Sequence, residues 1–217
     1  MTSEKKKLIA AAACFGAFIL LIILLKTVDV KPIGPQNSSV GFAALNGAFL
    51  KLTKQNDAFY KFSEGIGFIA LLSAAFFGFL GLLQLIKGKK LSAVDRDLYI
   101  LGGFYVVVLA VYLIFEAAVV NYRPILEDGA LAASFPSSHT MFGITLLGSA
   151  ALQFKKRLAD PRLRQIVISV CQLMVLLVVL LRLLSGWHWF TDVVGGILIG
   201  TALLLAYDVI SERFGKA

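Results

Sequence analysis

The chain has 217 residues, of which 59% are hydrophobic and only 16% are charged. Soluble domains contain about 45–50% apolar and about 25% charged residues. The composition therefore excludes an ordinary soluble domain and a disordered chain, and it favours a membrane protein with several spans. The net charge of +8 would suggest nucleic-acid binding in a soluble protein. Basic cytoplasmic loops explain it in a membrane protein, so we expect no nucleic-acid partner.

Six apolar segments follow one another along the chain. About 20 apolar residues are needed to cross a hydrocarbon core of about 30 Å as a helix, and lipid offers no hydrogen-bond partner to an exposed backbone. The sequence therefore predicts an all-α fold, a six-helix transmembrane bundle that forms one domain over residues 1–217, with an outer loop at 27–64. The predicted spans lie near residues 8–25, 65–86, 98–120, 138–154, 165–184 and 189–208.

The basic residues are unevenly divided between the two sides of this bundle. Of the 21 Lys and Arg residues, 14 lie in the termini and in the loops 87–97 and 155–164, which leaves 7 for the other side. Because cytoplasmic segments collect Lys and Arg, both termini are predicted to be cytoplasmic. The loops 121–137 and 185–188 then face the extracytoplasmic side of the cell membrane.

The chain has only two histidines, and both lie at the outer ends of predicted spans. They are His139 and His188, and the only arginines on that side, Arg123 and Arg182, also lie at span ends. An ionisable group at membrane depth costs about 2.5–3.5 kcal/mol on insertion scales, which makes a functional role the default. Two guanidinium and two imidazole groups at one interface suit a phosphoryl group, because Arg binds phosphate in a bidentate fork.

His188 and Asp192 are four residues apart at the start of the last span. On a helix this spacing places the carboxylate one turn beneath the imidazole. The carboxylate can then accept the Nδ1–H of the ring, which leaves Nε2 free as a nucleophile.

The residues from Phe135 to His139 open the fourth predicted span. Pro136 suits the first turn of a helix, and the hydroxyls of Ser137 and Ser138 suit capping positions. The free backbone N–H groups at such a helix start form an anion site.

Three segments resemble the signature motifs of a known family. They are Asn121-Tyr122-Arg123-Pro124, Phe135-Pro136-Ser137-Ser138-His139 and Arg182-x5-His188-x3-Asp192. They are similar to the patterns K-x6-R-P, P-S-G-H and S-R-x5-H-x3-D of the type 2 phosphatidic acid phosphatases, the PAP2 or lipid phosphate phosphatase superfamily. The resemblance covers roughly residues 60–210 and implies a PAP2-like integral membrane enzyme whose active site faces the outside.

The resemblance also implies a role for each matching residue. His188 would attack phosphorus and form a phosphohistidine, with Asp192 orienting its ring, and His139 would act as general acid and then as general base. The phosphate would be held by Arg123, Arg182, Ser137 and the backbone N–H groups of Ser138 and His139. No metal and no other cofactor is implied. The implied substrates are lipid phosphomonoesters or diphosphates of the undecaprenyl diphosphate, phosphatidate or phosphatidylglycerophosphate type.

Three positions depart from the family pattern. Ser138 replaces the Gly of P-S-G-H, Leu181 replaces the Ser before Arg182, and Glu116 replaces the Lys seven residues before Arg123. The last change alters the local charge by two units and is expected to weaken binding of a dianionic phosphate. The spacing from Glu116 also allows an ion pair with Arg123 or Arg182, and we favour this second interpretation.

Two other functions stay open at this stage. One is a lipid phosphotransferase on the same scaffold, and the other is a non-catalytic lipid-binding or transport protein, for which Glu116 is the main argument. Product analysis in labelled water separates a phosphatase from a phosphotransferase, and lipid flux without phosphate release would indicate transport. The expected partners are a lipid phosphate substrate and membrane lipids, and no feature of the sequence specifies an oligomeric state.

Overall fold

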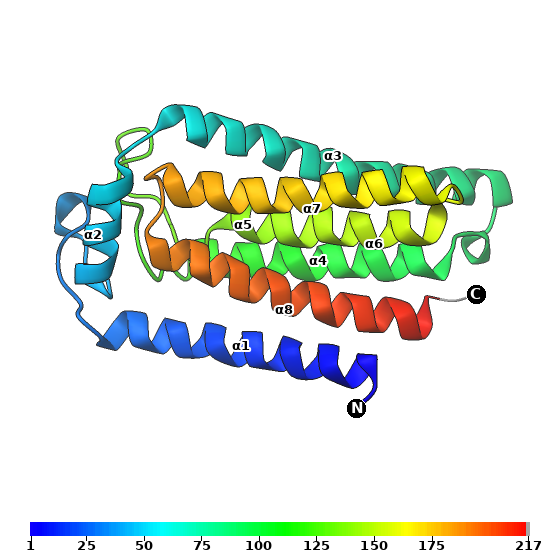
Figure 1. Cartoon of the computed structure of the whole chain (residues 1–217), viewed down its shortest axis with the longest axis horizontal. Helices are drawn as coiled ribbons and strands as arrows, with labels where there is room; N and C mark the ends of the chain where they lie inside the picture. The colour runs from blue at the N-terminus through cyan, green and yellow to red at the C-terminus, as the bar shows by residue number, and fades with distance from the viewer. Residues whose placement is uncertain (216–217) are drawn as a thin grey trace.

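The computed structural model describes residues 1–215, and most of its helices run side by side along one axis (Figure 1). A π-helical segment, η3 (Gly143–Leu147), joins two of the helices, and two short 3₁₀ turns lie in loops. Residues 1–215 contain no β-strand beyond isolated bridges, so the predicted all-α fold is confirmed. The helices are α1 (Ser3–Thr27), α2 (Ala43–Thr53), α3 (Asp57–Gly88), α4 (Arg96–Ala117), α5 (Ser138–Phe142), α6 (Gly148–Arg157), α7 (Pro161–Leu184) and α8 (Phe190–Phe214).

Five of these helices, α1, α3, α4, α7 and α8, are long and apolar enough to cross a membrane by length and composition. The fourth predicted span, 138–154, corresponds to α5, η3 and α6, which follow one another without a break. All residues of η3 are buried, because this segment packs against α3, α7 and α8. The continuous segment from α5 to α6 carries the polar residues Thr140, Thr145 and Gln153, which are buried and hydrogen-bonded.

The predicted start of the second span was wrong. α3 begins at Asp57 rather than near residue 65, because the side chain of Asn56 caps the helix by accepting a hydrogen bond from the Phe59 N–H at 3.0 Å. The outer segment between α1 and α3 therefore ends before Asp57, and Glu64 lies within a helix. α1 and α8 also extend past their apolar cores at the opposite end of the bundle, where charged residues continue both helices.

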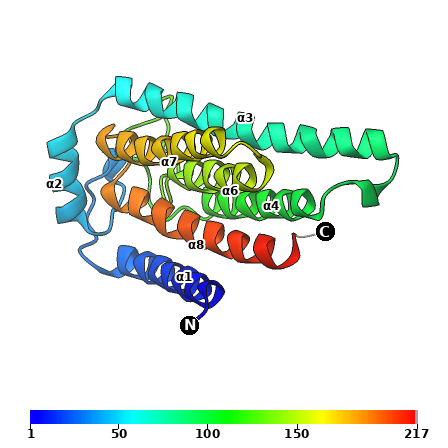
Figure 2. The same cartoon turned by 45° about the vertical axis from the view of Figure 1, so that its right-hand side comes forward.

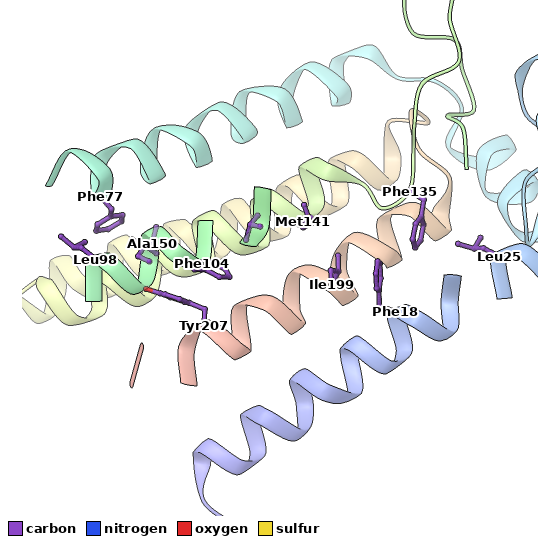
Figure 3. Close-up of a cluster of buried hydrophobic side chains, with 12 residues drawn as sticks. Phe18, Leu25, Phe77, Leu98, Phe104, Phe135, Met141, Ala150, Ile199 and Tyr207 are labelled. Carbon is purple, nitrogen blue, oxygen red and sulfur yellow. The ribbon is translucent and has the colours of Figure 1, made fainter. Parts of the chain in front are cut away.

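A row of aromatic and aliphatic side chains fills the space between α1, α4 and α8 (Figure 3). Phe104 of α4 stacks on Tyr207 of α8 with ring centroids 4.6 Å apart. Phe18 of α1 stacks on Phe135 with centroids 5.6 Å apart, and an added Cβ at Gly195 of α8 would overlap the Phe135 ring. The hydrophobic core therefore fixes the chain immediately before α5.

α2 lies across one end of the bundle, as Figure 2 shows. Asn46 of α2 is buried and bonds Thr191 at the start of α8, donating to its hydroxyl at 3.0 Å and accepting from its N–H at 3.2 Å. Gly186 has a φ of +70°, and an added Cβ there would overlap the carbonyl group of Lys54, so glycine is required at this close approach. The segment around α2 thus holds the α7–α8 loop in place.

The starting end of α1 and the final turns of α8 lie together at the other end of the bundle (Figure 1). Lys7 of α1 pairs there with Asp208 and Glu212 of α8 at 2.7 and 2.8 Å. The α3–α4 and α6–α7 loops lie at this same end. The structure therefore groups the basic segments as the sequence predicts, away from the loops 118–137 and 185–189.

A buried polar cluster joins α4, α6 and α8 at this end. The Asp97 carboxylate accepts hydrogen bonds from Lys156 Nζ at 3.0 and 3.2 Å, from Gln153 Nε2 at 2.9 Å and from the Ser211 hydroxyl. Gln153 Nε2 also donates to the Tyr207 hydroxyl at 2.7 Å. The buried charge of Asp97 is thus compensated by one cation and several donors, which ties three helices together.

Replacement of Asp97 by alanine is expected to lower the free energy of unfolding by about 3 kcal/mol, because it leaves Lys156 without its partner in a buried pair. This loss is at the lower end of the range for buried ion pairs, since the Lys156 side chain is 36% exposed. Unfolding in detergent micelles measures the effect. Glu4→Gln is the control, because Glu4 and Arg213 form an exposed pair at 3.7 Å that contributes at most about 1 kcal/mol. An Asp97→Ala protein as stable as the control would contradict this role.

Candidate functional site

The predicted site residues come together at the end of the bundle opposite the termini. They are supplied by the loop 118–137, the start of α5, the end of α7 and the start of α8. A cavity of about 200 Å³ lies between α4 and these segments, and its lining includes Glu116, Arg123, Glu127, Ser138 and His188. Segments that are far apart in the sequence therefore form one site.

His188 lies in the α7–α8 loop and is only 4% exposed. Its Nδ1 atom is 3.1 Å from Ser134 Oγ and 3.7 Å from Asp192 Oδ2, and the second distance is too long for a hydrogen bond. The Ser134 hydroxyl donates to Asp192 Oδ2 at 2.5 Å, so it can only accept a hydrogen bond from the Nδ1–H of His188. The predicted direct bond between His188 and Asp192 is thus replaced by a path through Ser134, which sequence reasoning missed. Nε2 is left with its lone pair.

Asp192 is fully buried at the start of α8 and connects the three motifs. Its carboxylate also accepts hydrogen bonds from Asn121 Nδ2 at 3.3 Å and from the Trp189 N–H at 3.0 Å. Its backbone carbonyl accepts a hydrogen bond from the Ser137 N–H at 2.9 Å. Neutral donors thus surround this carboxylate, as a buried carboxylate requires.

Glu64 of α3 is a second carboxylate of the site, and sequence reasoning missed it. Its Oε1 atom lies 2.9 Å from His139 Nε2 and accepts a hydrogen bond from Arg182 Nη2. The Arg182 guanidinium also lies over the Tyr60 ring, 4.7 Å from its centroid, and Tyr60 stacks on Trp187 with centroids 3.7 Å apart. The first turns of α3 therefore hold both a predicted phosphate-binding arginine and the predicted general acid.

Arg123 is held by the loop that follows it. Its Nε atom donates to the Ala133 carbonyl oxygen at 3.3 Å and lies 3.4 Å from Glu127 Oε2. Its backbone N–H donates to the Ala132 carbonyl oxygen at 3.0 Å. The loop thus folds back on itself and directs the guanidinium into the cavity.

Several buried nitrogen atoms of these side chains have no hydrogen-bond partner within the described chain. They are Arg123 Nη1, Arg182 Nε and Nη1, and His188 Nε2, together with His139 Nδ1. Buried donors without partners are uncommon and costly. The three guanidinium atoms can donate to an anion with several oxygens, as phosphate has, whereas His188 Nε2 is a potential nucleophile.

The two serines before His139 take different positions. Ser137 is fully buried, and its hydroxyl accepts a hydrogen bond from the Thr140 hydroxyl at 3.1 Å instead of capping the helix. Ser138 lines the cavity at the start of α5. Because the first N–H groups of a helix have no acceptor within it, the backbone of Ser138 and His139 offers donors at this wall.

Glu116 lines the cavity, but the favoured ion pair with an arginine was wrong. Within residues 1–215, the carboxylate partner of Arg123 is Glu127 and that of Arg182 is Glu64. The physical reason is the end of α4: the helix stops at Ala117 rather than near residue 120. Glu116 and Arg123 are therefore not on one helix face.

Burial holds the pKa of His188 well below its usual range, and the positive charges of Arg123 and Arg182 lower it further. The imidazole is therefore neutral at physiological pH, which is the form that can attack an electrophile. Among residues 1–215, no three His, Cys, Asp or Glu side chains are arranged to hold a metal ion.

Comparisons with known proteins identify the family and the fold of the chain. The family model of the PAP2 superfamily matches residues 38–215. Among solved structures, the crystal structure of the first transmembrane PAP2 type phosphatidylglycerolphosphate phosphatase from Bacillus subtilis is similar, with a TM-score of 0.65 and 18% identity over 94% of this chain and 96% of that chain. At this identity the likeness shows the fold. No curated protein matches the sequence.

The low pKa of His188 can be tested by nuclear magnetic resonance. As the pH falls through about 6.5, where histidine usually titrates, His188 is expected to stay neutral and to take up a proton only at lower pH. The ring ¹⁵N shifts of histidine-labelled protein in micelles measure this, and assignment is simple because the chain has 2 histidines. A His188 midpoint at or above the usual value would contradict the expectation.

Proposed function

Because the chain belongs to the PAP2 superfamily, we propose that it is a membrane lipid phosphatase that hydrolyses a lipid phosphomonoester or diphosphate through a phosphohistidine intermediate. One observation carries the proposal. The buried guanidinium donors of Arg123 and Arg182 that lack protein partners lie near the lone pair of His188 Nε2. An anion bound by these donors would face a nucleophile, and phosphoryl transfer depends mainly on such positioning and on charge neutralisation.

In the first half of the proposed reaction, His188 Nε2 attacks phosphorus. A P–N bond forms while the P–O bond to the lipid breaks, and the leaving oxygen takes a proton from His139. The proton on His188 Nδ1 stays in place and keeps its hydrogen bond to the Ser134 hydroxyl. Asp192 therefore stabilises the positive charge of the phosphorylated ring through this hydroxyl. Glu64 balances the positive charge of His139 before the transfer.

In the second half, a water molecule attacks the phosphorus atom. His139 accepts a proton from this water, the P–N bond breaks, and the electron pair returns to His188 Nε2. Orthophosphate leaves, and because His139 now holds the proton that it took from water, both histidines have returned to their starting states. Arg123 and Arg182 hold the non-bridging oxygens in both steps, where charge develops.

The proposed site faces the extracytoplasmic side of the membrane. The support is the grouping of the basic loops at the opposite end of the bundle. Amphipathic rings also surround the site, among them Tyr60 and Trp187, as is typical at the level of lipid head groups. The cavity is bordered by Tyr112 and Phe115 of α4, and the neighbouring Ile114 is 58% exposed. A lipid in the outer leaflet would therefore reach the cavity beside α4.

Phosphate release from a lipid phosphate supplied to the outside of right-side-out vesicles tests function and orientation together. The wild-type protein is expected to release phosphate without permeabilisation, whereas His188→Ala removes the nucleophile and is expected to lose at least about a thousandfold in rate. His139→Ala is expected to lose about a hundredfold or more in rate.

The same reaction in ¹⁸O-labelled water separates a phosphatase from a phosphotransferase. A phosphatase places the label in orthophosphate, whereas a phosphotransferase passes the phosphoryl group to a lipid, and the product carries no label from water. Full activity of His188→Ala would overturn the mechanism.

Glu64 is proposed as a positioning residue for His139, and its effect should depend on the leaving group. Glu64→Gln is expected to slow release from an alkyl lipid phosphate about tenfold, because poorly aligned acid catalysis loses part of its effect. Release from p-nitrophenyl phosphate is expected to slow less, because p-nitrophenolate leaves without protonation. Lys61→Gln, one turn earlier and exposed, is the control. Equal slowing of both substrates by Glu64→Gln would contradict this role.

A further inference from the structure

Each arginine of the site is already paired with a carboxylate of the protein. Arg182 bonds Glu64, and Arg123 Nε lies 3.4 Å from Glu127. A bound phosphate would therefore meet two guanidinium groups whose positive charges are largely balanced. The positive charge of the site is smaller than a count of its arginines suggests.

Glu116 adds a third carboxylate to the same region. It lines the cavity together with Arg123, Glu127 and His188. Within residues 1–215, no Lys, Arg or His nitrogen forms an ion pair with it under a limit of 4.0 Å. His188 is neutral. The lining of the cavity therefore holds one cation, Arg123, and two carboxylates, Glu116 and Glu127, and the charges of Arg182 and Glu64 balance each other outside this lining.

We propose that this charge balance makes the site selective for lipid phosphomonoesters over lipid diphosphates, an inference that rests on the proposed phosphatase function. A monoester brings a dianion, and a diphosphate brings at least one further negative charge. In a cavity of about 200 Å³, that charge comes within several ångströms of Glu116 or Glu127. Like charges at such distances repel one another, and because Glu116 is exposed and the Glu127 side chain is 36% exposed, water reduces this repulsion. The unpartnered nitrogens of Arg123 and Arg182 suffice for a single phosphoryl group.

Residue 116 has the opposite charge to the residue of the family pattern. The signature K-x6-R-P has Lys where this chain has Glu116, and Lys at that place would balance the charge of a second phosphate. Glu116 instead repels it. Selectivity of this kind arises from repulsion of the wrong substrate as much as from attraction of the right one.

The test compares a prenyl monophosphate with the diphosphate of the same prenyl chain, in detergent with a chelator present so that no divalent cation screens the diphosphate. For the wild-type protein, kcat/KM is expected to favour the monophosphate by at least about tenfold. Glu116→Gln is expected to reduce this preference several-fold by raising kcat/KM for the diphosphate, and Glu116→Lys is expected to reduce it further. Glu127→Gln, which keeps a hydrogen-bonding side chain beside Arg123, is a second variant with the same expected direction.

Asp128→Asn is the matched control. Asp128 is exposed on the same loop, next to Glu127, but it does not line the cavity. Its φ is 50°, a conformation that asparagine also adopts readily. The control removes one negative charge from the outer face, so an unchanged preference would show that the position of the charge matters.

In the turnover assay, two results would overturn the inference: a wild-type preference for the diphosphate, or an unchanged preference in Glu116→Gln. Competition between inorganic orthophosphate and pyrophosphate for binding to the same proteins gives a readout that needs no turnover. Failure to hydrolyse any lipid phosphate would refute the proposed phosphatase function. Tighter binding of orthophosphate than of pyrophosphate, reversed in Glu116→Lys, would still support the charge selectivity, and equal binding of both anions by all variants would refute it.

Discussion

The hydrogen bonds of the Asp192 carboxylate determine where the outer loops lie. This side chain is fully buried, and a buried carboxylate is costly unless donors surround it. The donors come from Asn121 and Ser134 in the loop 118–137, and the Asp192 carbonyl holds the Ser137 N–H at the start of α5. Asp192 thus ties the loop 118–137 and the start of α5 to α8. The ring of His188 takes its tautomer from the same group, through Ser134.

A second constraint is the burial of an arginine. Arg182 is fully buried, and its charge is stabilised by Glu64 and by the Tyr60 ring. The carboxylate that stabilises this buried cation also reduces the attraction of the cation for a substrate anion. Glu127 does the same for Arg123. The stability that these pairs give to the protein and the affinity of the site for highly charged substrates are therefore opposed.

The all-α fold and the three motifs could be predicted because lipid thickness and local spacing fix them. The contacts between motifs could not. Ser134 carries no sequence signal of its own, and Glu64 carries only a weak one, since their partners Asp192 and His139 are far away along the chain. The weak signal lies in α3, where Glu64 and Gly67 share a helix face. Gly67 leaves room for the His139 ring, whose Cδ2 would lie 2.9 Å from an added Cβ. The predicted Glu116 ion pair failed because helix ends are set by capping and packing, which periodicity does not reveal.

The two ends of the bundle are built from similar groups and differ in one respect. At the end where α1 begins, Asp97, Lys156 and Ser211 bond one another, and their donors and acceptors are paired. At the end that holds the candidate site, a carboxylate, a hydroxyl and cations also lie close together, but nitrogens of Arg182 and His188 have no hydrogen-bond partner among residues 1–215. A cluster that is satisfied internally gains nothing from a ligand, whereas an unsatisfied one does. Unpaired nitrogens, rather than burial of charge as such, therefore distinguish the reactive end of this chain from its structural end.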